Sequence, residues 1–185
     1  MSEPLRVVVL LGAVRRGRQS ERVATFVRQR LALRADATVD SVDLAALALP
    51  VMEERLGRIE PPPPGLVEFG AAIERADAVV IVTPEYNHGY PGALKNALDY
   101  LYPQFRRTPV ALVTVSAGGH GGVNAWAQLV TVLAFMGAIV LPQTVAVAKV
   151  QDAFGADGTA LDPAYVRRVD AMLDELLWLA GRLRG

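Results

Sequence analysis

The feature of this sequence that most restricts its fold is a set of short aliphatic runs with no polar alternation. Residues 5–11 are almost entirely valine and leucine and end at Gly12, and residues 78–82 and 110–115 are built in the same way. A strand covered on one face alternates apolar and polar residues, whereas a strand covered on both faces is apolar throughout. These runs therefore predict buried strands of a parallel sheet.

Amphipathic segments separate the strands. Apolar residues recur at helical spacing over residues 19–34, with arginines on the other side. The other predicted elements are helices at 66–76, 91–102 and 124–136, strands at 38–44 and 139–147, and a last helix that Asp162 caps and Pro163 opens. Strands that alternate with helices form right-handed βαβ units, so we expect an α/β fold with helices on both faces of an open sheet. Residues 1–185 are expected to form one domain, and the pattern alone leaves the strand order open.

One long segment, residues 45–65, shows no helix or strand pattern. It contains four consecutive prolines, Pro61 to Pro64, which predict a stiff polyproline stretch. Two interpretations stay open, a surface spacer and an arm that packs on a neighbouring subunit.

The composition excludes several classes of function. The chain has no cysteine, which removes disulfide scaffolds, thiolate metal sites and cysteine nucleophiles, so any redox chemistry must come from a bound cofactor. With 19 basic and 19 acidic residues the net charge is zero, which argues against nucleic-acid binding. Hydrophobic residues make up 52% of the chain, enough to support a folded core.

The sequence also lacks the pattern of a targeting or membrane segment. The apolar run 7–11 is too short for a signal peptide, and the longest mostly apolar stretch, 129–147, is interrupted by Gly137 and Pro142. We therefore expect a cytoplasmic protein that does not bind membranes.

The loop after the first strand, residues 12–20, joins a buried strand to a helix. Free N–H groups and the helix dipole favour an anion at such a position, and Arg15, Arg16 and Arg18 add donors that suit phosphate. Val14 replaces the second glycine of a dinucleotide fingerprint, and the lysine and hydroxyl of a nucleoside-triphosphate loop are also missing. The loop predicts a phosphate site of another kind, and the alternative is an arginine-rich surface loop.

Two further loops follow strands at the same predicted edge of the sheet. Residues 83–92 include two prolines, two glycines and two tyrosines, which predicts a rigid, aromatic turn suited to a planar ring. Residues 116–122 include four glycines, whose bare N–H groups allow a ligand to approach closely. Ligands bind at the carboxyl ends of strands in open α/β sheets, so we expect the three loops to form one site, each with the alternative of a plain structural turn. His88 and His120 are the only histidines, and without cysteine they make a poor metal site.

The three loops, in this order and spacing, resemble the NADPH-dependent FMN reductase family of flavodoxin-like proteins, which includes NAD(P)H:quinone reductases and FMN-containing azoreductases. The most specific part is Pro-Glu-Tyr-Asn at 84–87 followed by residues 91–100. Asp-Leu-Ala at 43–45, leading to Leu-Pro at 49–50, also matches the family. The resemblance covers roughly residues 6–147.

The resemblance implies a flavodoxin-like, five-stranded parallel sheet of order 2-1-3-4-5, with FMN across the strand ends and NADPH or NADH as co-substrate. Flavin performs hydride transfer itself, so no residue is assigned a catalytic or metal-binding role. The implied contacts are Gly12, Arg15, Arg18, Gln19 and Ser20 around the 5′-phosphate, Pro84, Glu85, Tyr86 and Asn87 along the ring system, and Ser116, Gly118, Gly119 and His120 at the pyrimidine edge. Ala13 departs from the family, which commonly has serine at that position.

The implied function is an oxidoreductase in which NAD(P)H reduces bound FMN and a second acceptor then takes the electrons by a ping-pong route. The acceptor could be a quinone, an azo compound, free flavin or a metal oxyanion. The alternatives are a flavodoxin-type electron carrier and a flavin-binding regulatory protein, neither with its own NAD(P)H activity. Carriers are usually strongly acidic for docking, whereas this chain is neutral, which argues against a carrier.

Two predicted helices are apolar over a larger surface than packing against one hydrophobic core would require. Residues 124–136 are apolar over more than one face, and residues 91–102 end in Tyr100, Leu101 and Tyr102. Burial within the monomer and a subunit interface both explain this pattern. The family resemblance favours the interface, so we expect a homodimer or a homotetramer.

Overall fold

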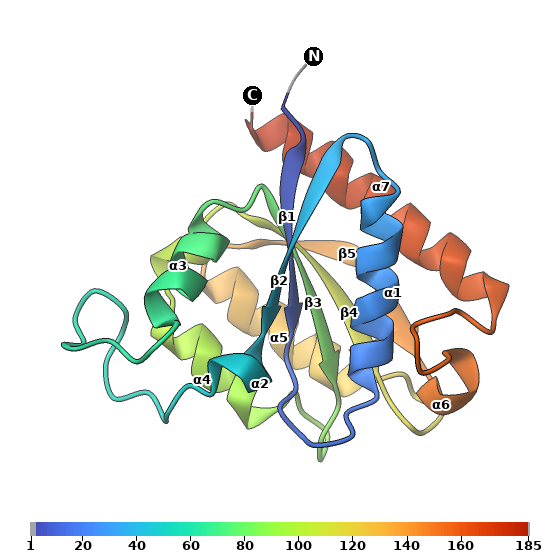
Figure 1. Ribbon diagram of the computed structural model, residues 1–185, viewed down its shortest axis with the longest axis horizontal. Coiled ribbons are helices and arrows are strands. Elements are labelled where there is room, and N and C mark those ends of the chain that lie inside the picture. The colour runs from blue at the N-terminus through green and yellow to red at the C-terminus, as the bar shows by residue number, and fades with distance from the viewer. Residues whose placement is uncertain (1–2, 185) are drawn as a thin grey trace.

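The computed structural model describes residues 3–184, and at its centre lies an all-parallel sheet of five strands in the order β2-β1-β3-β4-β5 (Figure 1). The strands are β1 (Leu5–Leu11), β2 (Ala37–Asp43), β3 (Ala78–Pro84), β4 (Pro109–Val115) and β5 (Ile139–Val147). Every neighbouring pair is parallel. The predicted fold class and the strand order of the flavodoxin-like resemblance are therefore confirmed.

The aliphatic runs of the sequence are the central strands. Every residue of β3 and β4 is buried, because neighbours flank these strands and helices cover both of their faces. The edge strands differ: β2 alternates between half-buried and exposed positions, and β5 contains Pro142, which lies where the register with β4 is interrupted. The absence of polar alternation thus identified the strands that lie inside the sheet.

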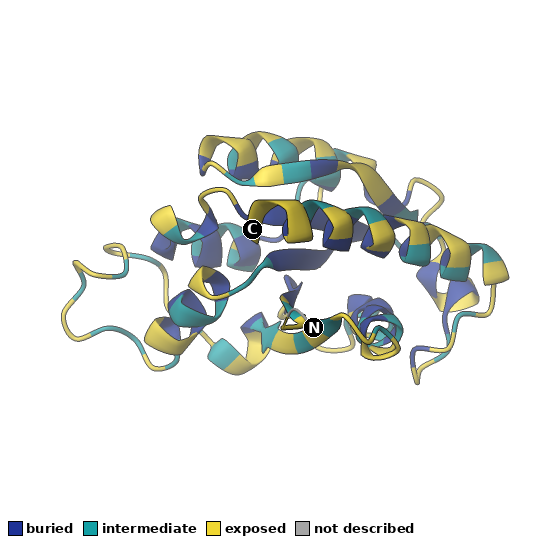
Figure 2. Cartoon of the chain, turned by 90° about the horizontal axis from the view of Figure 1, so that it is seen from above, coloured by how far each residue is buried: buried dark blue, intermediate teal, exposed yellow. Residues whose placement is uncertain are grey.

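Helices cover the two faces of the sheet and enclose two separate cores (Figure 1). Helices α1 (Ser20–Ala32) and α7 (Pro163–Arg184) pack on one face, while α3 (Leu66–Glu74), α4 (Gly92–Tyr100) and α5 (Val123–Phe135) pack on the other. Successive residues of a strand point to opposite faces, so Val7 and Val9 join the α1–α7 core, whereas Val8 and Leu10 join the α3–α5 core. Figure 2 shows the helices with buried inner and exposed outer surfaces.

Three short helical segments were not predicted: α2 (Leu44–Leu47), the 3-10 turn η1 (Pro103–Phe105) and α6 (Val150–Ala153). Leu44 was expected to end the second strand, but β2 ends at Asp43, whose carboxylate accepts the N–H of Ala45 (2.9 Å) and caps α2. Strand β3 extends two residues beyond the predicted end, so Thr83 and Pro84 belong to the strand. Asp162 caps α7 as predicted, with its carboxylate accepting the N–H of Ala164 (2.8 Å).

The segment between α2 and α3 is irregular, as predicted, and extends away from the sheet as a long loop at the left of Figure 1. Pro62 and Pro63 are half-buried, and the carbonyl of Pro63 accepts the N–H of Leu66 (3.1 Å) at the start of α3. The choice between a spacer and an intersubunit arm stays a prediction. None of the helices within residues 3–184 is long and apolar enough to span a membrane.

Candidate functional site

The three predicted loops lie at one edge of the sheet, because they follow the neighbouring strands β1, β3 and β4. They line a cavity of about 160 Å³ that is open to solvent. Its wall consists of Arg15, Arg18, Gln19, Ser20, Pro84, Glu85, Tyr86, Val115, Ser116, Ala117 and Val150. Residues predicted from all three loops are thus brought together at the strand ends.

Some predicted residues lie on these loops but not on the cavity wall: Gly12, Asn87, Gly118, Gly119 and His120. Conversely, Val115, Ala117 and Val150 line the cavity without having been predicted. Val150 begins α6 after the last strand, and its N–H is donated to the carbonyl of Ser116 (3.1 Å). No sequence signal connects these two distant positions, so only the folded chain reveals the contact.

The N-terminus of α1 carries polar atoms that lack a partner. Gln19 is the residue before the helix, and its side chain makes no capping hydrogen bond. Ser20, which begins the helix, is 1% exposed, and within residues 3–184 neither its Oγ nor the Oε1 of Gln19 has a hydrogen-bond partner. Buried polar atoms are nearly always paired in folded proteins. The Ser20 hydroxyl can donate a hydrogen bond, so together with the positive end of the helix dipole it suits a bound anion such as a phosphate group, whereas the Oε1 of Gln19 can only accept.

The arginines of this loop have different surroundings. Arg15 and Arg16 are exposed, and among the described residues neither has a carboxylate within ion-pair distance. Arg18 is different, because its guanidinium donates to both carboxylate oxygens of Asp43 and to the carbonyl of Ala13. Arg15 is therefore the arginine on the cavity wall whose charge is not already paired.

The loop after β3 is a tight turn. Tyr86 and Gly89 exchange backbone hydrogen bonds of 2.7 and 3.0 Å, and between them Asn87 and His88 both have positive φ angles, of 49° and 65°. The carbonyl of His88 also accepts the side-chain N–H of Gln128 on α5 (2.8 Å). These contacts fix the turn, which agrees with the predicted rigidity of this segment.

Glu85 uses its carboxylate within the protein. One oxygen accepts the backbone N–H groups of Asn124 (2.9 Å) and Ala125 (3.3 Å), and the other accepts the side-chain amide of Asn124 (3.0 Å). Burial alone would raise the pKa of Glu85, but these hydrogen bonds outweigh it, and the pKa is lowered. The carboxylate thus fastens the β3 loop to the N-terminus of α5.

The glycines after β4 have two distinct roles. Gly121 and Gly122 have positive φ angles, and a Cβ on Gly121 would lie 2.8 Å from the Cβ of Ala146, so their place in the fold requires glycine. Gly118 and Gly119 have open space where a Cβ would be. The hydroxyl of Ser116 organises the turn, because it donates to the carbonyl of Gly118 (2.9 Å) and accepts the N–H of Gly121 (2.9 Å).

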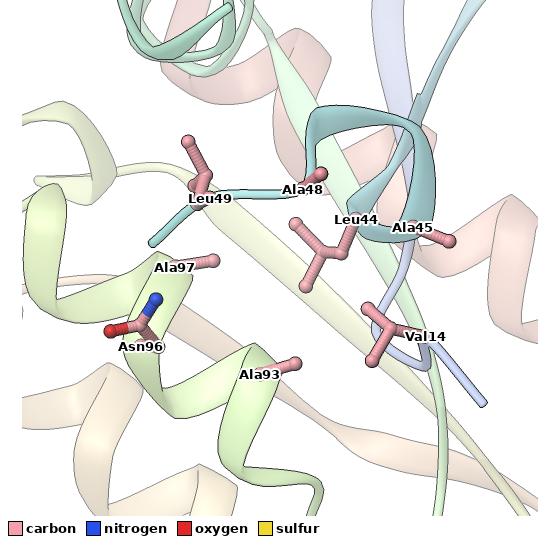
Figure 3. A pocket seen from close by; sticks show the side chains of 8 residues that line it. All are labelled: Val14, Leu44, Ala45, Ala48, Leu49, Ala93, Asn96 and Ala97. Atoms are coloured by element: carbon pink, nitrogen blue, oxygen red, sulfur yellow. The ribbon is translucent and has the colours of Figure 1, made fainter. Parts of the chain in front are cut away.

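A second cavity, of about 270 Å³, lies between the β1 loop, α2 and α4 (Figure 3). Its lining is Val14, Leu44, Ala45, Ala48, Leu49, Ala93, Asn96 and Ala97. The Asn96 amide donates to the carbonyl of Pro50 (2.7 Å) and accepts the N–H of Met52 (2.8 Å). The lining carries no charged side chain.

Comparison with known proteins supports a redox function. The family model described as NADPH-dependent FMN reductase matches residues 5–152. An NAD(P)H-dependent FMN reductase of Schizosaccharomyces pombe is 35% identical over 150 residues, covering 74% of this chain and 70% of the relative. A quinone reductase of Escherichia coli is 36% identical over 146 residues, covering 76% of each chain.

The fold has a similarly clear counterpart among solved structures. The flavoenzyme NAD(P)H:(acceptor) oxidoreductase FerB of Paracoccus denitrificans superposes with a TM-score of 0.78 at 24% identity, covering 96% of this chain and 98% of FerB. At that identity the likeness concerns the fold alone.

Proposed function

Because the chain belongs to the NADPH-dependent FMN reductase family and is therefore an FMN-dependent oxidoreductase, we propose that it oxidises NAD(P)H and reduces a second acceptor in ping-pong order. The acceptor classes are quinones, azo compounds, free flavin and metal oxyanions. Quinones come first, because the E. coli relative is named a quinone reductase. FMN held by the three loops would supply the hydride and electron-transfer chemistry that links the two substrates.

The observation that carries this proposal is the buried hydroxyl of Ser20 at the start of α1. The Oγ of Ser20 is buried without a partner among residues 3–184 and lies at the positive end of a 13-residue helix. The 5′-phosphate of FMN would accept a hydrogen bond from this hydroxyl and would bring the negative charge that this end of the helix favours. Arg15, exposed on the same cavity wall, would add a cation.

The other two loops would hold the flavin ring chiefly through their backbones. Glu85 and Ser116 use their side chains to fix loop geometry, so they orient the neighbouring peptide groups. The N–H groups near Gly118, Gly119 and His120 would face the pyrimidine edge and stabilise negative charge there. Pro84, Tyr86 and Asn87 would border the ring from the β3 side.

The experiment that tests the proposal begins with the purified protein. It should be yellow and release FMN on denaturation, and NAD(P)H should be consumed when a quinone is added. Initial rates at varied NADPH and quinone should give parallel double-reciprocal lines, the signature of a ping-pong order. Bound FMN without NAD(P)H oxidation would make the protein a carrier or a regulatory protein, and failure to bind FMN would refute the site itself.

We also propose that the protein is a homodimer or a homotetramer that acts in the cytoplasm, where NAD(P)H is available. The support for assembly is an exposed apolar surface at the end of α5 and in the segment just after α4. Phe135 is 76% exposed and Tyr102 is 39% exposed, and their rings are 6.0 Å apart. Both residues border a cavity of about 450 Å³ between these helices and the segment that contains Met52 and Arg55.

A further inference from the structure

The guanidinium of Arg18 is almost fully committed within the protein. Its Nη1 donates to the carbonyl of Ala13 (2.6 Å) and to Oδ1 of Asp43 (2.7 Å), and its Nη2 donates to Oδ2 of Asp43 (2.5 Å). Its Nε lies 3.5 Å from a carboxylate oxygen of Glu21, and the side chain is only 10% exposed. A paired bidentate geometry of this kind is the strongest form of arginine–carboxylate contact.

Asp43 connects this arginine to the sheet. It is the last residue of β2 and lies in register with Leu11, the last residue of β1, directly before the loop. Its Oδ1 also accepts the N–H of Ala45. Burial alone would raise the pKa of Asp43, but the hydrogen bonds from Arg18 and Ala45 lower it, so the carboxylate stays charged.

We propose that Arg18 and Asp43 form a clamp that fixes the shape of the phosphate loop, and that Arg18 is a positioning residue rather than a phosphate ligand. The clamp ties the loop to its own beginning at Ala13 and to the end of the neighbouring strand. Because Asp43 neutralises the guanidinium, Arg18 adds little net charge to the site. Asp43, which sequence reasoning did not assign to the site, becomes necessary for phosphate binding. This inference rests on the proposed FMN site.

The clamp and a direct phosphate contact give opposite results when Asp43 loses its charge. If Arg18 bound the phosphate, Asp43→Asn would release a guanidinium and remove a nearby negative charge, so FMN would bind as well or more tightly. If Arg18 acts through the clamp, Asp43→Asn weakens the loop geometry, so FMN binds less tightly. Arg18→Lys separates the models as well, because lysine keeps the charge but cannot form the bidentate pair.

The experiment measures the dissociation constants of the apoprotein for FMN and for riboflavin by quenching of flavin fluorescence. Riboflavin lacks the phosphate, so the ratio of the two constants reports on the phosphate loop alone. The variants are Asp43→Asn, Arg18→Lys, Arg18→Met and the double variant Arg18→Met/Asp43→Asn. Arg30→Met and Asp170→Asn are matched controls, because this pair is also bidentate (2.9 and 2.7 Å) and joins the other end of α1 to α7.

We expect each single clamp variant to weaken FMN binding about tenfold or more, the size of one lost charge-assisted hydrogen bond, with riboflavin binding little changed. The double variant should bind no more weakly than Arg18→Met, because both changes break one interaction. The control variants should retain the wild-type constants. Circular dichroism should show each apoprotein folded, and if Arg18→Met is not folded, Asp43→Asn and Arg18→Lys decide the test.

Three outcomes would overturn the clamp: unchanged or tighter FMN binding by Asp43→Asn, equal losses for FMN and riboflavin, or additive losses in the double variant. These are distinct from failure of the proposed function, in which the wild-type protein itself would not bind FMN.

Discussion

The buried hydroxyl of Ser20 indicates where the proposed ligand would bind. Its Oγ has no partner within the described chain, so it adds nothing to the stability of the apoprotein, yet it lies where the proposed phosphate would accept a hydrogen bond. We predict that Ser20→Ala weakens FMN binding about tenfold and leaves the unfolding temperature of the apoprotein unchanged or raised. Flavin titration and thermal unfolding of the apoprotein measure the two effects.

Riboflavin serves as the control ligand for Ser20→Ala, since it lacks the group that Ser20 would contact. An apoprotein that loses stability on this substitution would show that the hydroxyl has a structural partner in solution, and the argument from the unpaired atom would fail.

The carboxylate of Glu85 leads to a prediction about how the free energy of unfolding depends on pH. Its carboxylate accepts hydrogen bonds from the N-terminus of α5, so its pKa in the folded state is lowered from the ordinary value of 4.5. The resulting stabilisation is complete above the unfolded-state pKa and is lost as the pH falls from there through the folded-state pKa. We expect Glu85→Gln to lower the free energy of unfolding by about 1 kcal/mol at pH 7.

The difference between wild type and Glu85→Gln should shrink as the pH falls below about 4.5, because the wild-type carboxyl is then protonated too. Urea unfolding at a series of pH values between 7 and 3 measures this. Asp43 also has a lowered pKa, but it is present in both proteins and cancels in the difference. A difference that stays constant with pH would contradict the role given to the ionised carboxylate.

Among the elements, the helices that begin at this edge of the sheet differ in how their N-termini are satisfied. Helix α5 has a protein carboxylate, that of Glu85, at its first N–H groups. Helix α1, as far as the described part of the chain shows, has no side-chain cap and keeps a buried, unpaired hydroxyl at its first residue. Two similar helix ends therefore have different roles, since one holds a loop in place and the other is left for an anion.

The loop between β4 and α5 gives a prediction from two neighbouring glycines. Gly121→Ala would force a Cβ to 2.8 Å from Ala146 at a positive φ, so we expect a loss of about 1–3 kcal/mol in the free energy of unfolding. Gly119→Ala meets open space, so the apoprotein should keep its stability within about 0.5 kcal/mol. Its FMN affinity should nevertheless fall severalfold, because the added methyl occupies space beside the proposed ligand.

Urea unfolding and flavin titration of both glycine variants test this division of roles. If Gly119→Ala bound FMN as tightly as the wild-type protein, the proposed contact of this loop with the flavin would be wrong. If Gly121→Ala were as stable as wild type, the steric argument from Ala146 would be wrong.

The helices and strands also show which features could be predicted from the sequence. Central strands and the loops behind them could be predicted, because burial on both faces removes polar residues from a strand and ligands bind at strand ends. The contacts between residues within the site could not be predicted from the sequence. Arg18 is a plausible phosphate ligand in the sequence, and only the register of β2 beside β1 shows that Asp43 lies next to it. The contact of Val150 with the β4 loop is equally non-local.

At the scale of the whole molecule, the two hydrophobic cores hold in place the strands that support the site. Strands β1, β3 and β4, whose ends support the three loops, are anchored on both faces by separate layers of helices. The site therefore lies at the edge of the most buried part of the sheet. The large apolar groups left exposed at Tyr102, just after α4, and at Phe135, the last residue of α5, belong to another surface, which the monomer does not cover.

That surface gives the last prediction. Phe135 is 76% exposed at the end of α5, close to the ring of Tyr102, so a glutamate at this position should fold normally but oppose contact between apolar surfaces. We expect the wild-type protein to have at least the mass of a dimer at micromolar concentration and Phe135→Glu to shift it toward the monomer, as measured by light scattering after size-exclusion chromatography. Leu33→Glu is the matched control, because Leu33 is 70% exposed at the far end of α1 and should leave the mass unchanged. A monomeric wild-type protein, or a Phe135→Glu variant with the wild-type mass, would mean that this surface is not the subunit interface.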